Sequence, residues 1–594
     1  MTGKAGPAVR SHPTEGDPHM HEEREVSVPV ENTAQAYLEL LRARGIEYFF
    51  GNAGTDFGPL VDAFARFEAE GKDRPRPITV PHEFVAVSMA HGFTMCTGRP
   101  QVVMAHTIVG TANCAGALIN AARANIPLFM TAGRTPLVES GLPGARDLHI
   151  HWAQEAFDQA GVIREFLKWD YELRNFTQLQ SVVDRALSIA TSEPQGIAYL
   201  TLPREVLAEP QTEFRLKTAS AGTRRDRLQP DRALVEEAAA HLATAKSPLL
   251  ITTSLGRDPD AVGVLVGLSE ALAIPVVEFN PTHTNFPTSH PHHLGFDPAP
   301  FLERADVILV VESDVPWFPA RMRVNPRAPV IHVGGDPLFV RYPIRTFPMA
   351  IGLRGDPAST LAALTSEGRR RVRDHVASLG AHSAALRTEH DAQRAAWRSA
   401  ALAAQAESPI DFDWLSRCVG EVVGEDIILV NEYDLRPTQV CRDRPGAYFS
   451  HSPAGCLGWG VGAALGVKLA HPDRTVIATV GDGAYVFSVP TAAHMVSAAY
   501  DLPILVIVFN NGGWGAVRKT TEGLFPTGWA AKTGAFPLSE FKPVPAYEKI
   551  VEAHGGYGER VERPEQVGPA LRRALKVVRE DGRQAVLNVI CRRD

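Results

Sequence analysis

The chain repeats one order of helices and strands near its two ends, and this repeat restricts its fold more than any other sequence feature. In the first copy a helix is predicted to begin after Asn32. The strands that follow in the two copies are expected at 46–50, 101–105 and 127–131, and at 426–430, 475–480 and 503–509. Residues that end matching elements are 379, 372 and 376 positions apart: Gly45 and Gly424, Pro100 and Pro472, Pro127 and Pro503. Nearly equal offsets predict two copies of one α/β domain.

A third α/β segment lies between the copies, with strands expected at 248–253, 275–279, 307–311 and 330–333. The predicted fold class is therefore α/β, with three doubly wound parallel-sheet domains, of which the first and last resemble each other. The predicted divisions are a flexible N-terminal tail at 1–27, a first domain at 28–215, a middle domain at 216–365, a linker at 366–405 and a last domain at 406–594. We also expect a turn at Gly110 before the helix that follows the strand 101–105.

Composition excludes several classes of protein. Lys plus Arg number 60 against 67 Asp plus Glu, giving a formal charge of -7 over 594 residues, which argues against a nucleic-acid partner. The apolar runs are shorter than the roughly 18 residues that a membrane-spanning helix needs. The six cysteines form no CxxC pair, so neither a disulfide framework nor a zinc ribbon is indicated and a cytoplasmic setting fits best.

Oxygen ligands for a cation are expected at the ends of two strands in the last domain. Gly481, Asp482 and Gly483 end one strand, and Asn511 and Gly513 follow the next. The carboxyl edge of a parallel sheet is where ligands bind in open α/β folds, and Mg²⁺ prefers carboxylate, amide and carbonyl oxygens. The helix that begins near Ala484 would point its N-terminus at an anion. Either motif alone is more often a simple turn, but the two together predict a magnesium diphosphate site.

The run from Gly481-Asp482-Gly483 to Asn510-Asn511 spans 31 residues and resembles the signature of the thiamine diphosphate (ThDP) enzymes, the 2-oxoacid decarboxylase and acetolactate synthase superfamily. The resemblance covers residues 28–592 and implies a pyrimidine-binding first domain, a middle domain and a diphosphate-binding last domain. Benzoylformate decarboxylases look closest, since 51–55, 105–113 and 286–291 resemble stretches of that group, and acetolactate synthases are the next comparison.

The resemblance also implies roles for individual residues of the cofactor site. Glu83 matches the carboxylate that hydrogen-bonds the aminopyrimidine; its alternative is a helix-opening acid that favours the macrodipole. Leu457 matches the apolar residue beneath the bent cofactor, with ordinary core leucine as the alternative. The implied cofactor-binding set is completed by residues on the strand ends and loops of both outer domains: Asn113, Asn431, Glu432, Gly481, Asp482, Gly483, Ala484, Asn511 and Gly513. Asp482, Asn511 and Gly513 would hold Mg²⁺.

Two further residues are predicted to act on the substrate. His106 ends a strand, and an imidazole can move protons near neutral pH. At the end of a strand, a histidine with a purely structural role is about as common as a catalytic one. The sequence around His106 resembles that of the family, which favours a catalytic role. Thr55 matches a serine that orients the substrate carboxylate. The alternative is a structural role, in which its hydroxyl stabilises a turn or caps a helix.

The middle domain departs from the aryl 2-oxoacid decarboxylases. They place a second proton-handling histidine there, whereas this chain reads Asp314-Val315-Pro316-Trp317-Phe318-Pro319. Trp317 and Phe318 could instead form an apolar substrate wall. The cluster His290, His292 and His293 lies in a proline-rich run and is expected to be solvated surface.

The predicted function is therefore a ThDP- and Mg²⁺-dependent C–C lyase that decarboxylates a small 2-oxo acid through a C2 ylide and an enamine. One alternative is an acetolactate synthase-like carboligase that joins two acyl units, and another is an inactive nucleotide-binding regulatory homologue. FAD in the middle domain is left open but not favoured, because that segment has no glycine-rich nucleotide fingerprint. The resemblance implies a homodimer or homotetramer with the active site between subunits.

Overall fold

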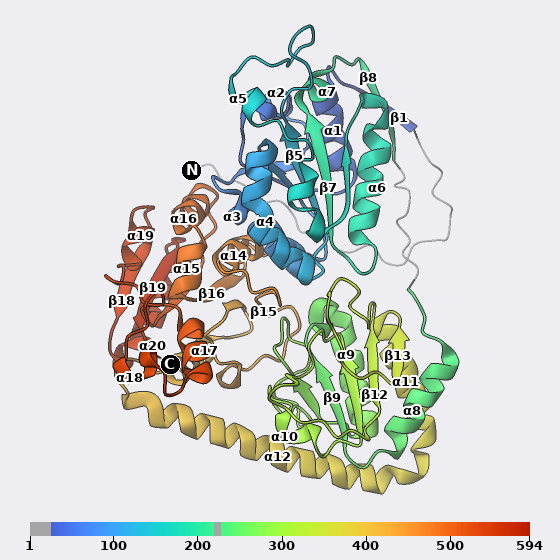
Figure 1. The fold of residues 1–594 in the computed structure, drawn as a ribbon, viewed down its shortest axis with the longest axis vertical. Coiled ribbons are helices and arrows are strands. Elements are labelled where there is room, and N and C mark those ends of the chain that lie inside the picture. The colour runs from blue at the N-terminus through green and yellow to red at the C-terminus, as the bar shows by residue number, and fades with distance from the viewer. Residues whose placement is uncertain (1–24, 219–226, 594) are drawn as a thin grey trace, which may run out of the picture.

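The computed structural model describes residues 25–218 and 227–593 and arranges them in three sheet-centred domains (Figure 1). The first sheet has the parallel order β3 (Arg76–Thr79), β2 (Tyr48–Gly51), β4 (Val102–Ala105), β5 (Leu128–Arg134), β7 (Ile197–Pro203) and β6 (Leu167–Glu172). Its helices are α1 (Thr33–Ala43), α2 (Gly58–Ala69), α3 (Glu83–Thr97), α4 (Thr107–Arg123), α5 (Ile150–Ala153), α6 (Leu179–Thr191) and α7 (Arg204–Ala208).

The last sheet has the parallel order β15 (Tyr448–Ser450), β14 (Ile427–Glu432), β16 (Thr475–Gly481), β17 (Leu505–Asn510), β19 (Ala585–Ile590) and β18 (Tyr557–Val561). Adding twelve to each strand number of the first sheet reproduces this order, so the two outer domains share one topology. The helices of the last domain are α13 (Phe412–Val422), α14 (Trp459–Ala470), α15 (Asp482–Phe487), α16 (Pro490–Ala499), α17 (Gly515–Leu524), α18 (Trp529–Thr533), α19 (Glu548–Glu552) and α20 (Val567–Arg579).

The middle domain has a five-stranded parallel sheet in the order β10 (Val276–Glu278), β9 (Pro248–Thr252), β11 (Val307–Val311), β12 (Val330–Gly334) and β13 (Ile351–Arg354). Its helices are α8 (Arg232–Thr244), α9 (Pro259–Leu272), α10 (Ala299–Leu302) and α11 (Pro357–Arg371). Separate apolar clusters cover its two faces, as a doubly wound sheet requires. The predicted α/β class with three parallel-sheet domains is thus confirmed.

Two segments connect or flank the domains. The long helix α12 (Val376–Ala403) runs along one side of the molecule from the middle to the last domain (Figure 1). An antiparallel pair, β1 (Glu25–Pro29) with β8 (Glu213–Lys217), joins the two ends of the first domain. Residues 25–27 of the predicted tail therefore belong to a strand, and residues 1–24 lie outside the described residues. Within the described ranges, no helix is both long and apolar enough to cross a membrane.

The first and last domains pack directly through α3 and α14. Glycines allow the two helices to approach closely, since a Cβ at Gly92 would lie 2.1 Å from Ala463 O and one at Gly466 would lie 2.0 Å from Met89 O. A single apolar cluster consequently extends across both domains and includes Phe84 and Trp459. This packing fixes the position of the N-terminal residue of α3 relative to that of α14.

Two sequence predictions are wrong. Gly110 lies inside α4 rather than in a turn, because the helix begins directly after His106 and the missing side chain leaves room for Glu83, whose Oε1 would lie 3.0 Å from a Cβ there. The predicted solvated cluster is also mostly buried: His292 and His293 are 3% and 0% exposed. His293 Nε2 lies 3.0 Å from Glu278 Oε2, and α12 covers this loop through Arg394.

Candidate active site

Glu83 is the first residue of α3 and is buried, with a relative exposure of 4%. Asn52 Nδ2 donates to its Oε1 at 2.9 Å and Asn113 Nδ2 donates to its Oε2 at 3.2 Å. Both oxygens therefore accept amide protons, an arrangement that suits an ionised carboxylate. Asn113, expected from sequence to bind the cofactor, contacts Glu83 in this chain, and sequence reasoning assigned no role to Asn52.

His106 lies at the carboxyl end of β4 and pairs with a carboxylate that the sequence analysis did not single out. Its Nδ1 is 2.5 Å from Asp56 Oδ1, and this contact raises the pKa of the His106 imidazole. Asp56 is 3% exposed and also accepts from the backbone N–H of Thr107. A Cβ on Gly54 would lie 2.1 Å from the His106 ring, so the glycine lets the 51–55 turn pack on the imidazole. Asp56 follows Thr55 directly, and that adjacency was the available sequence signal.

Thr55 is exposed, and its side chain faces a second histidine that sequence reasoning missed. His151 Nε2 lies 3.4 Å from Thr55 Oγ1. The neighbouring Gln154 accepts from Thr107 Oγ1 at 3.2 Å. The segment after β5 thus returns to the turn at residues 54–56, far from it in sequence, so no local motif could have indicated the contact.

Asp482 and the loop Asn511–Gly513 meet at the carboxyl edge of the last sheet. Asp482 Oδ2 accepts from the backbone N–H groups of Gly512 and Gly513 at 2.9 and 3.0 Å, and Oδ1 accepts from Gly483 N–H at 2.9 Å. Asn511 Oδ1 accepts from Gly513 N–H at 3.2 Å. The structure therefore brings together the three residues expected to hold Mg²⁺.

The charge on Asp482 has no counter-ion among the residues the structure describes. The side chain is 1% exposed, and burial raises the pKa of its carboxyl to about 6 although three N–H groups act against this. A buried carboxylate is stable only when it is paired, and a divalent cation would supply the missing charge. The residues present fit Mg²⁺, which would take oxygens from Asp482, Asn511 and Gly513.

The remaining predicted residues of this domain surround the same edge. Gly481 is the N-cap of α15, and Gly483 and Ala484 form its first turn. A Cβ on Gly483 would lie 2.3 Å from the Trp514 ring, so only glycine fits. A small cavity of 20 Å³ beside Asn511 is lined partly by Trp514. It is too small for a diphosphate, so a cofactor would have to bind outside it.

Glu432, the last residue of β14, binds backbone groups at the start of α14. It is fully buried, and its two oxygens accept from the backbone N–H groups of Gly458, Trp459 and Gly460 at 2.7–3.2 Å. Burial raises the pKa of its carboxyl to about 7. Glu432 therefore holds the first turn of α14. Asn431 accepts from Thr479 Oγ1 at 2.9 Å and likewise stabilises the sheet edge.

Leu457 is half-buried in the turn before α14 and packs against the cluster shared by the outer domains. The adjacent Cys456 is fixed by the first domain, since its N–H donates to Asn120 Oδ1 at 3.1 Å and its carbonyl accepts from Asn120 Nδ2 at 2.8 Å. These two bonds connect α4 to the turn that carries Leu457.

The other predicted features of the middle domain are structural. Trp317 is 2% exposed and packs edge-on against Phe347 at 5.2 Å in that domain's core, whereas Phe318 is 40% exposed and packs against Phe279. Trp317 therefore cannot form an open substrate wall.

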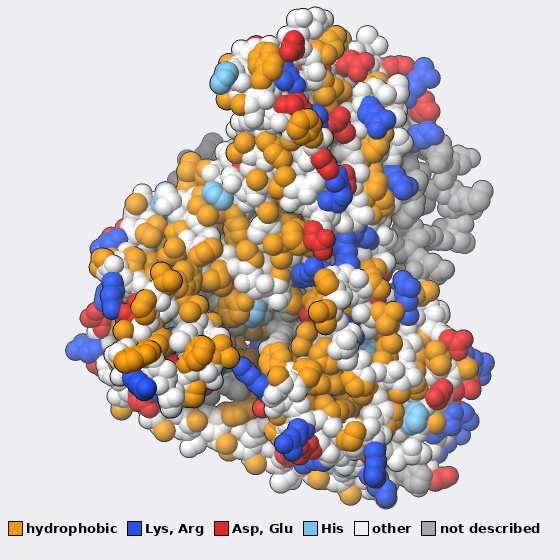
Figure 2. All heavy atoms as spheres, in the orientation of Figure 1, with side chains coloured by type: hydrophobic (Ala, Val, Ile, Leu, Met, Phe, Trp, Pro, Cys, Tyr) orange, Lys and Arg blue, Asp and Glu red, His pale blue; other side chains and the backbone are white. Residues whose placement is uncertain are grey.

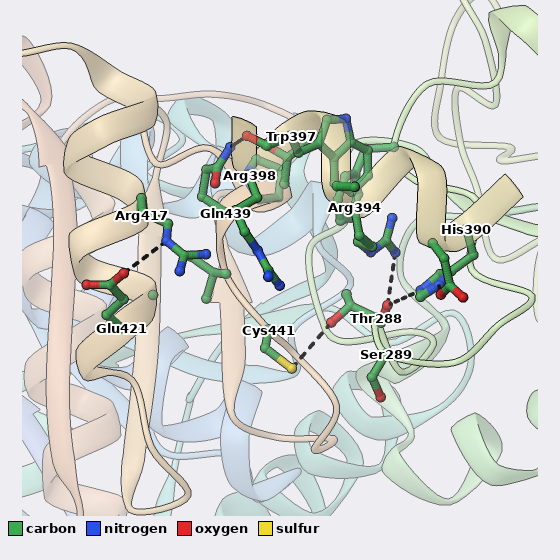
Figure 3. A pocket seen from close by; sticks show the side chains of 17 residues that line it. Thr288, Ser289, His390, Arg394, Trp397, Arg398, Arg417, Glu421, Gln439 and Cys441 are labelled. Atoms are coloured by element: carbon green, nitrogen blue, oxygen red, sulfur yellow. Dashed lines mark hydrogen bonds and ion pairs between the residues drawn. The ribbon is translucent and has the colours of Figure 1, made fainter. Parts of the chain in front are cut away.

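A cavity of 600 Å³ lies elsewhere, between the middle domain, α12 and the last domain (Figure 3). Its charged lining consists of three arginines and a histidine facing two carboxylates: Arg394, Arg398, Arg417, His390, Asp391 and Glu421. None of the predicted site residues lines it. The residues predicted from sequence lie instead at the edges of the outer sheets.

Three family models match the chain in succession. They are the N-terminal thiamine pyrophosphate (TPP) binding domain at residues 31–162, the central domain of thiamine pyrophosphate enzymes at 235–364, and the C-terminal TPP binding domain at 437–589. The chain belongs to the thiamine pyrophosphate enzyme family. It is accordingly a ThDP-dependent enzyme of the decarboxylase and acetolactate synthase group, and the reading as an inactive homologue is set aside.

Relatives within the thiamine pyrophosphate family include enzymes of more than one activity. The chain is 30% identical over 504 residues to benzoylformate decarboxylase from Pseudomonas aeruginosa, covering 81% of this chain and 86% of the relative. It is 26% identical over 601 residues to sulfoacetaldehyde acetyltransferase from Alcaligenes xylosoxydans xylosoxydans, covering 94% and 93%. The fold is also that of the ThDP-dependent 4-hydroxybenzoylformate decarboxylase from Rhodococcus jostii RHA1, with a TM-score of 0.73, 24% identity and coverage of 95% and 99%.

Proposed function

We propose that this enzyme is a Mg²⁺-dependent decarboxylase of a small 2-oxo acid, with Glu83, His106 and Thr55 as its catalytic residues. Bound ThDP would supply the nucleophilic carbon and the electron sink that decarboxylation of a 2-oxo acid needs. In this proposal Glu83 accepts a hydrogen bond from the aminopyrimidine, and its own position is fixed by Asn52 and Asn113. Thr55 orients the substrate carboxylate.

The observation that carries the proposal is the His106–Asp56 pair next to Thr55. Asp56 favours the protonated imidazole, so His106 is suited to give a proton to a carbanionic carbon and thereby to release an aldehyde. The similarity to benzoylformate decarboxylase also supports this outcome.

The second candidate is a carboligase or acyltransferase, which would pass the acyl carbanion equivalent left after CO₂ loss to an acceptor instead of protonating it. Similarity to sulfoacetaldehyde acetyltransferase over 94% of the chain, and to an acetolactate synthase large subunit from Mycobacterium tuberculosis at 26% identity, favours it. Both candidates share the first steps, so access of the acceptor distinguishes them.

A screen of 2-oxo acids, including benzoylformate and pyruvate, tests the two candidates when CO₂ and organic products are both measured. Equal amounts of CO₂ and a free aldehyde support the decarboxylase. A product with two acyl units and no free aldehyde supports the carboligase and contradicts the first proposal. Absence of CO₂ from every acid defeats both, and the absorbance spectrum of the same protein would reveal a bound flavin.

The proposed metal site can be tested independently of turnover. Asp482→Asn removes the carboxylate that accepts three N–H groups, and we expect ThDP binding measured by titration calorimetry to lose its dependence on Mg²⁺. Asp581→Asn, on the C-terminal side of α20, is the control. Unchanged Mg²⁺ dependence in Asp482→Asn would place the metal elsewhere.

A further inference from the structure

The segment that carries His151 buries a polar residue and exposes apolar ones. The His151 side chain is 3% exposed, whereas Leu148, Ile150 and Trp152 are 43%, 38% and 47% exposed. Burial of apolar surface alone would favour the opposite orientation. The inward side chain has hydrogen-bond partners at both ring nitrogens.

The two ring nitrogens of His151 face different partners. Nδ1 accepts from the backbone N–H groups of Asp147 and Leu148 at 3.2 and 3.3 Å, whose hydrogens are fixed by the peptide planes. These hydrogens leave no space for a proton on Nδ1. Asp147 Oδ1 lies 3.3 Å from the same nitrogen, but this oxygen already accepts a hydrogen bond from Arg204 Nη2 at 3.2 Å.

A neutral imidazole whose Nδ1 accepts must carry its proton on Nε2. Nε2 lies 3.4 Å from Thr55 Oγ1, so His151 donates to this oxygen. Thr55 then serves as acceptor toward His151, and its own hydroxyl proton is free to point away from His151. Burial and the nearby guanidinium of Arg204 lower the pKa of His151, which keeps the ring in the neutral form that this arrangement needs.

We propose that His151 is a positioning residue of the active site, which sets the direction of the Thr55 hydroxyl so that Thr55 donates to the substrate carboxylate. The inference rests on the proposed function, because it needs a carboxylate substrate beside Thr55. It assigns to the first domain a second histidine at the substrate end of the site. Gln154, three residues on, accepts from Thr107 next to His106 and thereby anchors the same segment.

A double-mutant cycle tests the proposal in the ThDP-loaded enzyme. We expect His151→Leu to raise KM for the 2-oxo acid about tenfold, because the hydrogen bond from Thr55 to the substrate carboxylate would be lost. The affinity for ThDP should change little. His151→Gln, which retains an N–H donor, should recover part of this loss. His149→Leu, an exposed neighbour whose side chain makes no capping hydrogen bond, is the matched control and should leave KM unchanged.

The decisive comparison is the same substitution in a Thr55→Ala background. If His151 acts through Thr55, His151→Leu should have no further effect on KM there. An equal tenfold effect in both backgrounds would show that His151 acts by another route and would overturn the proposal.

The tautomer offers a readout that does not depend on turnover. In ¹⁵N-histidine NMR of the holoenzyme we expect an unprotonated Nδ1 and a protonated Nε2 for His151, with the Nε2 signal shifted by Thr55→Ala. A proton on Nδ1 overturns the proposal. If the wild type releases CO₂ from no 2-oxo acid, the proposed function fails, while the NMR result still decides whether His151 directs the Thr55 proton.

Discussion

Individual side chains at the candidate site are held by polar neighbours that are distant in sequence. The two asparagines that bind Glu83 come from the end of β2 and from α4, and together they satisfy both carboxylate oxygens. We therefore expect Glu83→Gln to fold normally, since an amide can keep one of these bonds.

Turnover should nevertheless fall about 10²–10⁴-fold in Glu83→Gln, because an amide cannot favour the reactive tautomer of the cofactor. ThDP binding, measured by calorimetry, should be largely retained. Glu68→Gln, an exposed carboxylate on α2, is the control. Undiminished turnover in Glu83→Gln would rule out the proposed catalytic carboxylate.

His106 gives a pH-dependent prediction. Asp56 raises the pKa of the imidazole, so Asp56→Asn should lower it and move the corresponding limb of the kcat/KM profile to lower pH. The stabilising effect of the pair is present below the unfolded-state pKa and is lost as pH rises through the folded pKa. The unfolding free energies of wild type and variant should accordingly differ most at acidic pH.

Urea unfolding at several pH values measures that difference, and Asp62→Asn on the exposed face of α2 is the control. A pH profile identical to that of wild type in Asp56→Asn would show that the pair does not determine the protonation of His106.

At the level of elements, the α3–α14 contact leaves no room for a larger side chain at its glycines. Gly92→Ala places a Cβ 2.1 Å from Ala463 O, and relief of this overlap should cost about 1–3 kcal/mol. Gly263→Ala in α9, where a Cβ meets nothing within 4 Å, should instead gain about 0.5–1 kcal/mol. Thermal unfolding of the two variants compares them, and equal Tm values would contradict the close contact.

The sequence predicted several central elements because these follow from local rules. Asn32 caps α1 by accepting from Gln35 N–H, Gly98 ends α3 in the left-handed conformation, and β4, β9, β11 and β16 are continuous apolar runs. Edge strands such as β3 and β6, which are partly exposed and lack an apolar run, were not predicted. The interior strands β7 and β19 were not predicted either, although both are buried.

The residues of the candidate site likewise fall into those that local sequence motifs indicated and those that only the fold brings together. Motifs located Glu83, His106, Thr55, Asp482 and Asn511, since each lies at an element end that the sequence marks. Asn52 and Asp56 lie within or beside the 51–55 stretch and His151 has no motif, but the contacts of all three become visible only when the chain folds back on itself. His293 was misjudged for the same reason, because its burial depends on Glu278 and on α12.

For the whole molecule, exposed apolar side chains indicate association between copies. The outer domains expose large hydrophobic residues on the segment after β5 and on α15–α18, and Figure 2 shows hydrophobic side chains gathered over the latter region. Examples are Phe157, which is fully exposed, and Phe487, Phe525 and Trp529 at 52%, 62% and 81%. Such patches are unusual on a monomer.

We therefore expect a homodimer or homotetramer in solution, with Phe487 in the contact. Phe487→Asp should reduce the mass measured by light scattering to that of a smaller species and abolish turnover, because the proposed active site lies between subunits. Ile344→Asp, an 83% exposed residue of the middle domain, is the control. A fully active wild-type monomer would contradict this expectation.

The two hydrogen bonds between Asn120 and the backbone of Cys456 connect the outer domains at the turn that carries Leu457. Both backbone groups of Cys456 are tied to α4, so the turn bearing Leu457 travels with the N-terminal domain although it belongs to the C-terminal one. A displacement of one outer domain relative to the other would therefore shift Leu457, the residue that the resemblance places beneath the cofactor.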